Sequence, residues 1–267
     1  MTIDLARPRL RSRKDPWTPE VSECLDHLIS SRIRNNQNVL AAICGETGSG
    51  KSYAAMRLGE LCDPNFSIDN VVFSIPEFLD KLGSSGPGDV LIFDESQAWG
   101  ARRAMSKKNV EMTDIAAMCR FTLVNVLFTA PALSFIDVSL RRLMHLYIQV
   151  TPLQNRARWP PRYRNKTRIV PRIVIRPSEG GDLHYAIPRV PVVRGGVRRR
   201  VKTEVLWLNA PSPELLEAYE RRKHDVFGEK LRAARGAVGV GTTPRPQADS
   251  SSGGAADLLE LLDLGSR

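Results

Sequence analysis

One short glycine-rich segment constrains the fold of this chain more than any other feature. It reads Gly45-Glu46-Thr47-Gly48-Ser49-Gly50-Lys51-Ser52 and fits the pattern G-x-x-x-x-G-K-[ST] at every fixed position. The apolar run Val39–Cys44 before it reads as a buried strand, and Lys51 to about Leu61 reads as a helix. A strand, loop and helix in this order indicate an α/β fold whose loop backbone cradles phosphate oxygens.

The polar residues of this loop have expected roles. Lys51 is expected to reach the β- and γ-phosphates of a nucleotide, and the Ser52 hydroxyl is expected to ligate Mg²⁺. Tyr53 follows directly and is grouped with the eight loop residues as nucleotide-binding. The sequence therefore predicts ATP and Mg²⁺ as cofactors.

A second apolar run ends in two carboxylates. Val90–Phe93 reads as a strand covered on both faces, and Asp94 and Glu95 follow it directly. At a strand's carboxyl end, Asp94 is expected to hold Mg²⁺ through water, and Glu95 to orient or deprotonate the attacking water. Lys51, Asp94 and Glu95 are thus the predicted catalytic residues. The adjacent glutamate favours hydrolysis over phosphoryl transfer to a small molecule.

Strands and helices alternate through residues 18–150. Thr18-Pro19-Glu20 has the composition of a helix start, and Ser74-Ile75-Pro76-Glu77 has capping-box spacing. This alternation predicts a mostly parallel sheet with helices on both faces, of the RecA-like kind found in P-loop nucleotide hydrolases. Further strands are expected at Val71–Phe73, Leu123–Phe128 and Leu146–Val150, and further helices at 109–120 and Phe135–Met144.

The composition changes at Thr151. Prolines become frequent, and short strands are expected at Ile169–Ile175, Leu183–Ile187 and Val201–Leu206. The tail over 255–264 is acidic and apolar, and reads either as a peptide that docks on a partner or as an end without a role. The expected divisions are 1–17 (disordered, basic), 18–150 (α/β core), 151–210 (basic β-rich module), 211–235 (C-terminal helix) and 236–267 (flexible linker and tail).

Positive charge is concentrated in the β-rich module. Residues 151–205 hold 14 Lys and Arg against 3 Asp and Glu, a formal net charge of +11, whereas the whole chain carries +10. This segregation is typical of contacts with a nucleic-acid backbone, with a solvated face or an acidic protein partner as the alternatives. Trp159 and Tyr163 lie among the arginines and are candidates for stacking on unpaired bases. The predicted DNA-contacting residues, without base specificity, are Arg156, Arg158, Arg162, Arg164, Arg168, Arg198, Arg199 and Arg200.

The cysteines and the hydropathy pattern indicate the cellular environment of the protein. The four cysteines form no C-x-x-C pair, so a zinc site or disulfide framework is not expected. The basic N-terminus is not followed by an apolar stretch, and the longest apolar run, Phe121–Ile136, contains Asn125 and Pro131. We therefore expect a cytoplasmic protein without a membrane span.

Three segments together resemble a known family. They are the glycine-rich loop, LIFDESQAW (91–99), and LVNVLFTAPALSFIDVSLRRLMHLYIQV (123–150). They are similar to the FtsK–HerA side of the P-loop ATPases, and within it to the Zot-like (zonula occludens toxin-like) ATPases of viruses and mobile elements. The resemblance covers about residues 38–150. It implies a ring, expected to be a hexamer.

The resemblance also implies roles for individual residues. Thr129 and Gln97 are candidate sensors of the γ-phosphate, although Ala130 stands where the family has a glutamine after the threonine. Candidates for an arginine that reaches the neighbouring subunit's ATP are Arg141, Arg142 and Arg120. Many Zot-like proteins of filamentous phages are membrane-anchored, and this sequence offers no such span.

Three functions remain open. The leading hypothesis is an ATP-hydrolysing motor that binds DNA nonspecifically and moves or packages it for a virus or mobile element. The second is a morphogenesis ATPase that acts on protein. The third is a nucleotide-gated switch that recruits a partner through residues 255–264. A small-molecule kinase is the least favoured reading.

Overall fold

The structure is a computed structural model, and it describes residues 19–94, 114, 117–136, 138–151, 161–175 and 183–237. The chain divides into two units, Met1–His224 and Asp225–Arg267. The expected disorder of residues 1–17 and the linker and tail beyond 237 lie outside the described residues.

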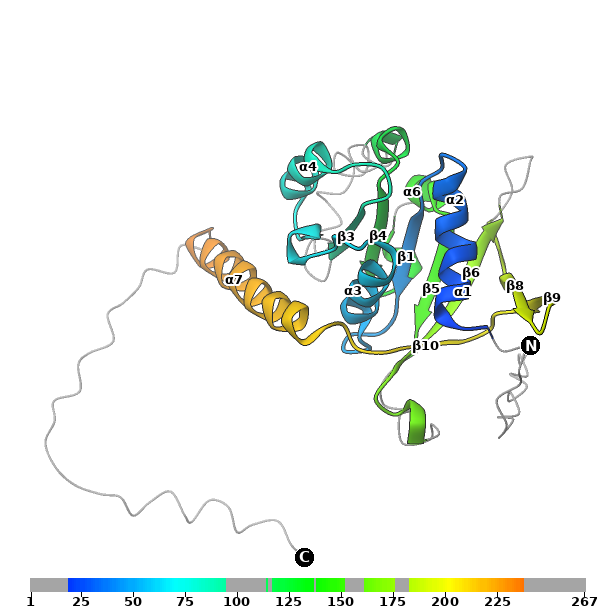
Figure 1. The fold of residues 1–267 in the computed structure, drawn as a ribbon. Coiled ribbons are helices and arrows are strands. Elements are labelled where there is room, and N and C mark those ends of the chain that lie inside the picture. Colours follow the sequence, from blue (N-terminus) through cyan, green and yellow to red (C-terminus); the bar gives the residue numbers. More distant parts are fainter. Residues whose placement is uncertain are drawn as a thin grey trace, which may run out of the picture. The chain divides into compact units, whose positions relative to one another are not determined.

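Strands and helices alternate along most of the first unit (Figure 1). The strands are β1 (Leu40–Cys44), β2 (Val71–Val72), β3 (Val90–Asp94), β4 (Asn125–Ala130), β5 (Leu146–Val150), β6 (Thr167–Ile175), β7 (His184–Ala186), β8 (Arg189–Arg194), β9 (Val197–Lys202) and β10 (Leu206–Leu208). The helices are α1 (Val21–Leu25), η1 (Asp26–Ser30), α2 (Ser31–Arg34), α3 (Lys51–Cys62), η2 (Ile68–Asn70), α4 (Ile75–Ser84), η3 (Leu133–Phe135), α6 (Val138–Leu143), η5 (Pro161–Tyr163) and α7 (Pro213–Ala237). Residues 117–122 are also helical.

The central sheet is α/β in character and mostly parallel. Five parallel strands follow the order β5-β1-β4-β3-β2, and antiparallel β6 adds to β5 and pairs with both β10 and β7. Strand β4 therefore lies between β1 and β3, and Thr129 of β4 is the register partner of both Ile43 and Asp94. The carboxyl ends of β1, β4 and β3 meet at one edge of the sheet, where ligand sites form in such folds.

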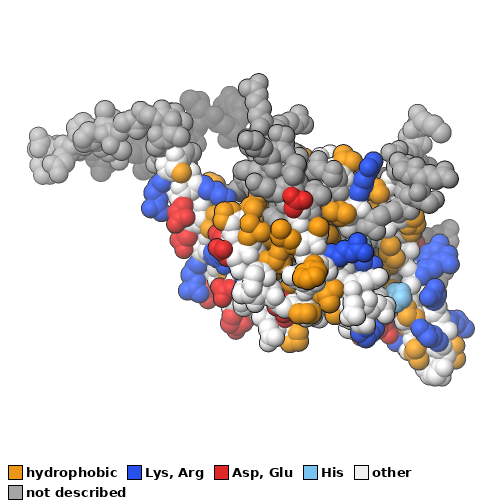
Figure 2. Space-filling model, turned by 90° about the horizontal axis from the view of Figure 1, so that it is seen from above, with side chains coloured by type: hydrophobic (Ala, Val, Ile, Leu, Met, Phe, Trp, Pro, Cys, Tyr) orange, Lys and Arg blue, Asp and Glu red, His pale blue; other side chains and the backbone are white. Residues whose placement is uncertain are grey.

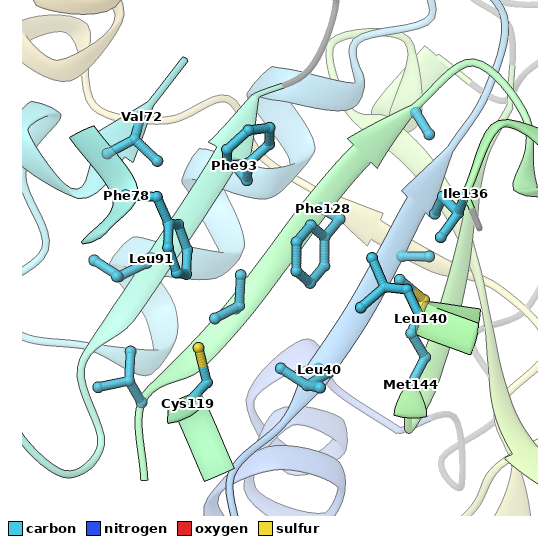
Figure 3. Close-up of a cluster of buried hydrophobic side chains, with 14 of the residues drawn as sticks. Leu40, Val72, Phe78, Leu91, Phe93, Cys119, Phe128, Ile136, Leu140 and Met144 are labelled. Carbon is cyan, nitrogen blue, oxygen red and sulfur yellow. The ribbon is translucent and has the colours of Figure 1, made fainter. Parts of the chain in front are cut away.

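Helices cover both faces of the parallel strands. Ala42, Leu91 and Phe128 face a buried cluster with Phe78 of α4, Cys119, and Leu140 of α6 (Figure 3). Helices α3 and α1 lie against the opposite face (Figure 1). The near-continuous apolar sequences of β1 and β3 follow from this, because both of their faces are buried.

Several predicted boundaries agree with the observed elements. Strand β5 has the expected bounds, and α4 begins after Ser74, whose Oγ accepts from the Glu77 N–H at 3.4 Å. The first helix starts later than the Thr18 cap predicted: α1 begins at Val21 with Glu20 at its N-cap. The Glu20 N–H donates to Glu23 Oε2 at 2.9 Å, so an acidic side chain takes the capping role.

The β-rich module expected over 151–210 is divided between two sheets. Strands β6, β7 and β10 extend the central sheet, and β8 and β9 alone form a two-stranded ribbon. Strand β8 was not expected, because Pro188 and Pro191 obscure its pattern, although an edge position tolerates proline. The strand predicted at Val201–Leu206 is interrupted at Thr203, which is buried and donates its N–H to the Pro188 carbonyl at 2.8 Å.

The ribbon is fixed to the first helix. Arg194 donates through Nη1 and Nη2 to the two carboxylate oxygens of Glu23, at 2.6 and 2.9 Å. Beside this pair, the Cys24 thiol and the Thr203 hydroxyl lie 3.6 Å apart in a buried contact. The basic ribbon therefore has a defined place against α1.

The C-terminal helix is α7, which agrees closely with the helix expected over 211–235. The Leu215 N–H lies 3.4 Å from Ser212 Oγ, in the position of an N-cap contact. Among the described helices, none is long and apolar enough to cross a membrane.

Candidate functional site

The glycine-rich loop follows β1 and leads directly into α3. Gly50 has φ +89°, a left-handed conformation that favours glycine, and caps α3. At Gly45, a Cβ would lie 2.6 Å from Ser49 Oγ and 2.8 Å from the Val150 carbonyl oxygen, so only glycine fits there. The first N–H groups of α3 have no acceptor within the helix, as at any helix N-terminus, and they follow the loop directly. The loop thus has the construction of an anion cradle.

Lys51 lies at the mouth of this cradle. Its Nζ donates to the carbonyl oxygens of Gly45 and Glu46, at 2.9 and 2.8 Å. Burial lowers the pKa of Lys51 and repulsion from Lys223 adds to this, while the Asp94 charge acts in the opposite direction. An incoming phosphate would offer this ammonium group a charged acceptor in place of two neutral ones.

Asp94 is the most densely contacted polar side chain of the site. It is 2% exposed, and its Oδ1 accepts from Ser52 Oγ at 3.0 Å and from Thr129 Oγ1 at 2.6 Å. Its Oδ2 accepts from the Tyr219 hydroxyl at 2.6 Å. The structure therefore brings the two predicted metal ligands, Ser52 and Asp94, into direct contact, with the predicted sensor Thr129 beside them.

Helix α7 contributes one wall of the site. Tyr219 is fully buried, and its ring stacks on Phe73 with centroids 6.2 Å apart and meets Tyr53 edge-on at 6.3 Å. Burial raises the pKa of the Tyr219 phenol, and the Asp94 charge raises it further. The Tyr53 hydroxyl donates to Glu220 Oε1 at 2.9 Å, so Tyr53 joins the loop's helix to α7.

These groups surround a cavity of about 480 Å³, within the usual range for small-molecule sites. One side is formed by the loop and the start of α3, the other by the end of β4 and by α7. Two lysines, Lys51 and Lys223, contribute to its lining. The lining residues are Thr47, Gly48, Gly50, Lys51, Ser52, Tyr53, Thr129, Ala130, Pro131, Thr167, Tyr219, Glu220 and Lys223.

The loop and the Ser52–Asp94 pair fit a metal–nucleotide ligand. Ser49 Oγ is buried, and no hydrogen-bond partner is found for it within the described part of the chain. Hydroxyl and carboxylate oxygens are the donors that Mg²⁺ prefers, with phosphate oxygens and waters completing its shell. No cluster of three or more His, Cys, Asp or Glu side chains suited to a metal occurs in the described ranges.

The other predicted nucleotide residues have mixed outcomes. Glu95 and Gln97 lie outside the described residues. Arg120 and Arg142 line a depression of about 700 Å³ with Leu40, at the opposite end of β1 from the loop. Arg141 is half-buried, and its Nε has no hydrogen-bond partner among the described residues. The roles of these arginines therefore stay predictions.

The predicted DNA-contacting arginines divide into three groups. Arg198, Arg199 and Arg200 are exposed on β9, on the side where Figure 2 shows Lys and Arg side chains gathered at the right. Arg162 and Arg164 are exposed, whereas Arg168 is half-buried and donates to Thr151 Oγ1 at 2.8 Å. Arg156 and Arg158, with Trp159, lie outside the described residues.

Tyr163, a candidate for stacking on bases, is engaged in a ring contact within the chain. Its ring lies on Trp207 of β10, with centroids 4.4 Å apart and an interplanar angle of 8°. The guanidinium of Arg162 lies 4.8 Å from the same ring. Tyr163 therefore fixes η5 to the sheet.

The sequence prediction missed the contribution of α7. Tyr219, Glu220 and Lys223 line the cavity, and Thr167 at the start of β6 does so from the other side. The i, i+4 spacing of Leu215 and Tyr219 indicates that α7 buries one face. That spacing carries no information about which element the face packs against.

Comparisons with known proteins give one structural likeness to report. A scan against protein-family models finds no match to the sequence, and a search of the curated proteins finds none either. Among solved structures, the chain is similar to the N-terminal domain of zonular occludens toxin from Neisseria meningitidis. That likeness has a TM-score of 0.32 and 17% identity, and it covers 51% of this chain and 83% of the other.

Proposed function

We propose that this protein is a P-loop ATPase that binds Mg²⁺ and ATP at the loop 45–52 and hydrolyses ATP with Asp94 and Glu95. The observation that carries the proposal is the contact between Ser52 Oγ and Asp94 Oδ1, at 3.0 Å beside a glycine loop that caps a helix. The hydroxyl after the loop lysine and the carboxylate that ends β3 come from segments 42 residues apart. Their meeting at the mouth of an anion cradle supports a shared metal–phosphate ligand.

The chain's own groups account for binding and orientation. The loop N–H groups and Lys51 hold the phosphates, and Ser52 and Asp94 supply oxygen donors to the metal shell. Mg²⁺, when bound, neutralises the charge that develops on the phosphate oxygens. Thr129 fixes the Asp94 carboxylate through the 2.6 Å bond to Oδ1, and in this proposal it has the sensor role as well.

In this proposal, Glu95 directs a water at the γ-phosphate as general base. Glu95→Gln keeps the size of the side chain but removes the charge that accepts a proton. We expect this variant to bind ATP normally and to lose turnover by about 100-fold or more. Fluorescent-nucleotide titration and phosphate release measure the two properties separately. Normal hydrolysis by the variant would overturn the assignment of the base.

The finer part of the proposal is that hydrolysis serves DNA handling. Arg198, Arg199 and Arg200 are three consecutive exposed arginines on a ribbon, and no acidic residue interrupts them. Exposed arginines can bind the phosphate backbone, and such phosphate contacts carry no base-sequence information. We propose nonspecific DNA binding through β9, together with Arg162 and Arg164, and stimulation of ATP turnover by DNA.

A ring of subunits completes the proposal. In such a ring, expected to be hexameric, Arg120, Arg141 or Arg142 would contact the nucleotide of a neighbour, which would explain why Arg120 and Arg142 lie away from the loop of their own chain. A docking partner for residues 255–264 is part of the same proposal. Mass measurement in solution with ATP, Mg²⁺ and DNA tests for the ring, and a monomer under all conditions would overturn it.

A further inference from the structure

We propose that the first turns of α7 form an autoinhibitory latch, in which the Tyr219 hydroxyl takes the place of the metal's water shell beside Ser52 and Asp94. The latch would regulate the cavity between the glycine loop and α7, and this inference rests on the proposed Mg²⁺–ATP site. Tyr219 donates to Asp94 Oδ2 at 2.6 Å, while Ser52 and Thr129 donate to Oδ1. Both oxygens of the carboxylate are therefore already engaged by the chain itself.

The phenol and a hydrated Mg²⁺ compete for one place. Ser52 Oγ and the Tyr219 hydroxyl both donate to the Asp94 carboxylate, so the phenol lies beside both expected metal ligands. Mg²⁺ holds its oxygen ligands at about 2.0–2.1 Å in strict octahedral geometry, and it keeps several waters. The Tyr219 hydroxyl bonded to Asp94 Oδ2 occupies the place of one of those waters, so metal loading requires this hydroxyl to leave the carboxylate.

Helix α7 is held over the site by contacts at both ends of this segment. At its start, the Ser212 N–H donates to Glu60 Oε1 of α3 at 2.9 Å. One turn beyond Tyr219, Arg222 donates through Nη1 to the Ile68 carbonyl at 3.0 Å and lies 3.8 Å from Glu77. The latch thus spans from the loop's helix to the far edge of the parallel strands.

The closed arrangement is suited to opening. Within Pro213–His224, Leu215 and Tyr219 are the apolar side chains in the buried class, so little apolar surface holds the segment down. Lys51 and Lys223 both line the cavity, so two positive charges face the space where a polyphosphate would bind. A metal-bound polyphosphate relieves their repulsion and competes for Asp94, so the ligand itself can open the latch.

The test measures metal affinity in the full chain. Mn²⁺ replaces Mg²⁺, with a nonhydrolysable ATP analogue present, and free Mn²⁺ is followed by electron paramagnetic resonance. Tyr219→Phe keeps the ring contacts with Phe73 and Tyr53 but removes the hydroxyl. We expect it to bind Mn²⁺ about tenfold more tightly than the wild type, a difference of about 1.4 kcal/mol. Unchanged or weaker Mn²⁺ binding would overturn the latch and make Tyr219 a positioning residue for Asp94.

A second variant loosens the helix without touching the metal ligands. Arg222→Gln removes the charge that contacts Glu77 and weakens the bond to Ile68, and we expect it to tighten Mn²⁺ binding in the same direction. The neighbouring exposed residue provides the matched control, Arg221→Gln, which should behave as the wild type. If Arg222→Gln and Arg221→Gln bind Mn²⁺ equally, the helix does not gate the site.

Hydrogen exchange gives a readout that needs no variant. Amides of residues 216–224 should exchange faster when Mn²⁺ and the analogue are added, and unchanged exchange would contradict opening. Metal-free titration with a fluorescent ATP analogue separates the two proposals. Absence of nucleotide binding by wild type and variants removes the proposed function and the latch together. Normal nucleotide binding with unchanged metal affinity in Tyr219→Phe removes the latch alone.

Discussion

Two positively charged regions of this chain are built in opposite ways. The cavity at the glycine loop has two lysines, Lys51 and Lys223, and depends on backbone N–H groups held in one conformation. The ribbon instead presents consecutive arginines, Arg198–Arg200, as exposed side chains. A cavity that recognises phosphate by shape should fail when one group changes, whereas a surface that recognises it by charge should weaken in increments.

The largest effect on ATP turnover is expected at the glycine loop, where phosphate binding depends on the shape of the cavity. Lys51→Ala removes the ammonium group from the mouth of the loop, and ATP turnover should fall by about 100-fold or more, as when a fixed donor to developing charge is lost. Phosphate release measures turnover, and nucleotide titration measures binding. The thermal midpoint should not fall, since this side chain is half-buried and, among the described residues, its hydrogen bonds go to loop carbonyls. A variant with wild-type turnover would refute the phosphate role of the loop.

A graded effect is expected on the ribbon. Replacing Arg198, Arg199 and Arg200 by Ala removes three exposed charges, so the slope of log K against log salt for duplex DNA should fall by about 2–3. Fluorescence anisotropy at several salt concentrations measures this slope. The control is Arg221/Lys230/Arg232→Ala, which removes the same charge from exposed positions of α7. Equal losses in the two triple variants would mean that net charge alone binds DNA.

A smaller effect follows from backbone strain at the loop. Gly50 has φ +89°, so Gly50→Ala forces a side chain into the left-handed region and should cost about 1–2 kcal/mol of stability. Gly83 provides the matched control, because it lies inside α4 and a Cβ there meets nothing within 4 Å. Gly83→Ala should be neutral or stabilising, since Ala favours helix. Denaturant unfolding compares the two, and equal costs would argue against a strained loop.

The smallest effect concerns pH and the attachment of the ribbon. Hydrogen bonds from Arg194 hold the pKa of Glu23 below its ordinary value of 4.5. The pair therefore stabilises the fold above about pH 4.5, and this contribution is lost as pH falls through the lowered pKa. Arg194→Ala should reduce the thermal midpoint at pH 7 by at most about 2–4 °C, with the gap closing in acid. Circular dichroism melts at pH 7 and pH 3.5 measure it, and a gap independent of pH would contradict the cause.

Features that depend on neighbouring residues could be predicted from the sequence. The loop 45–52, the strand ending at Asp94 and the cap at Ser74 are local patterns, in which each residue type serves the conformation of its own segment. The Ser52–Asp94 contact was also within reach, because parallel strands with a crossover place their carboxyl ends at one edge.

Features that depend on contacts between distant segments could not be predicted from the sequence. Alternation identifies Ile169–Ile175 as a strand, but nothing in it indicates that β5 is the partner, so the strand was assigned to the basic module without a partner. Tyr219 is a similar case, since its spacing from Leu215 shows a buried helix face without naming Asp94, 125 residues away. The contact of Tyr163 with Trp207 could not be predicted either, because it depends on the path of the chain between them.

Thr167 places the first residue of β6 beside the glycine loop, and this has a mechanical consequence. Thr167 opens β6 and lines the cavity, and it lies nearest to the position that a Cβ on Gly50 would take, at 3.8 Å. From there β6 runs for nine residues, about 30 Å, paired with β5, β10 and β7. If ligand binding displaced the loop, the displacement would act on Thr167 at the start of β6. Because β6 is a continuous paired strand, it would transmit this displacement to its other end, near Ile175.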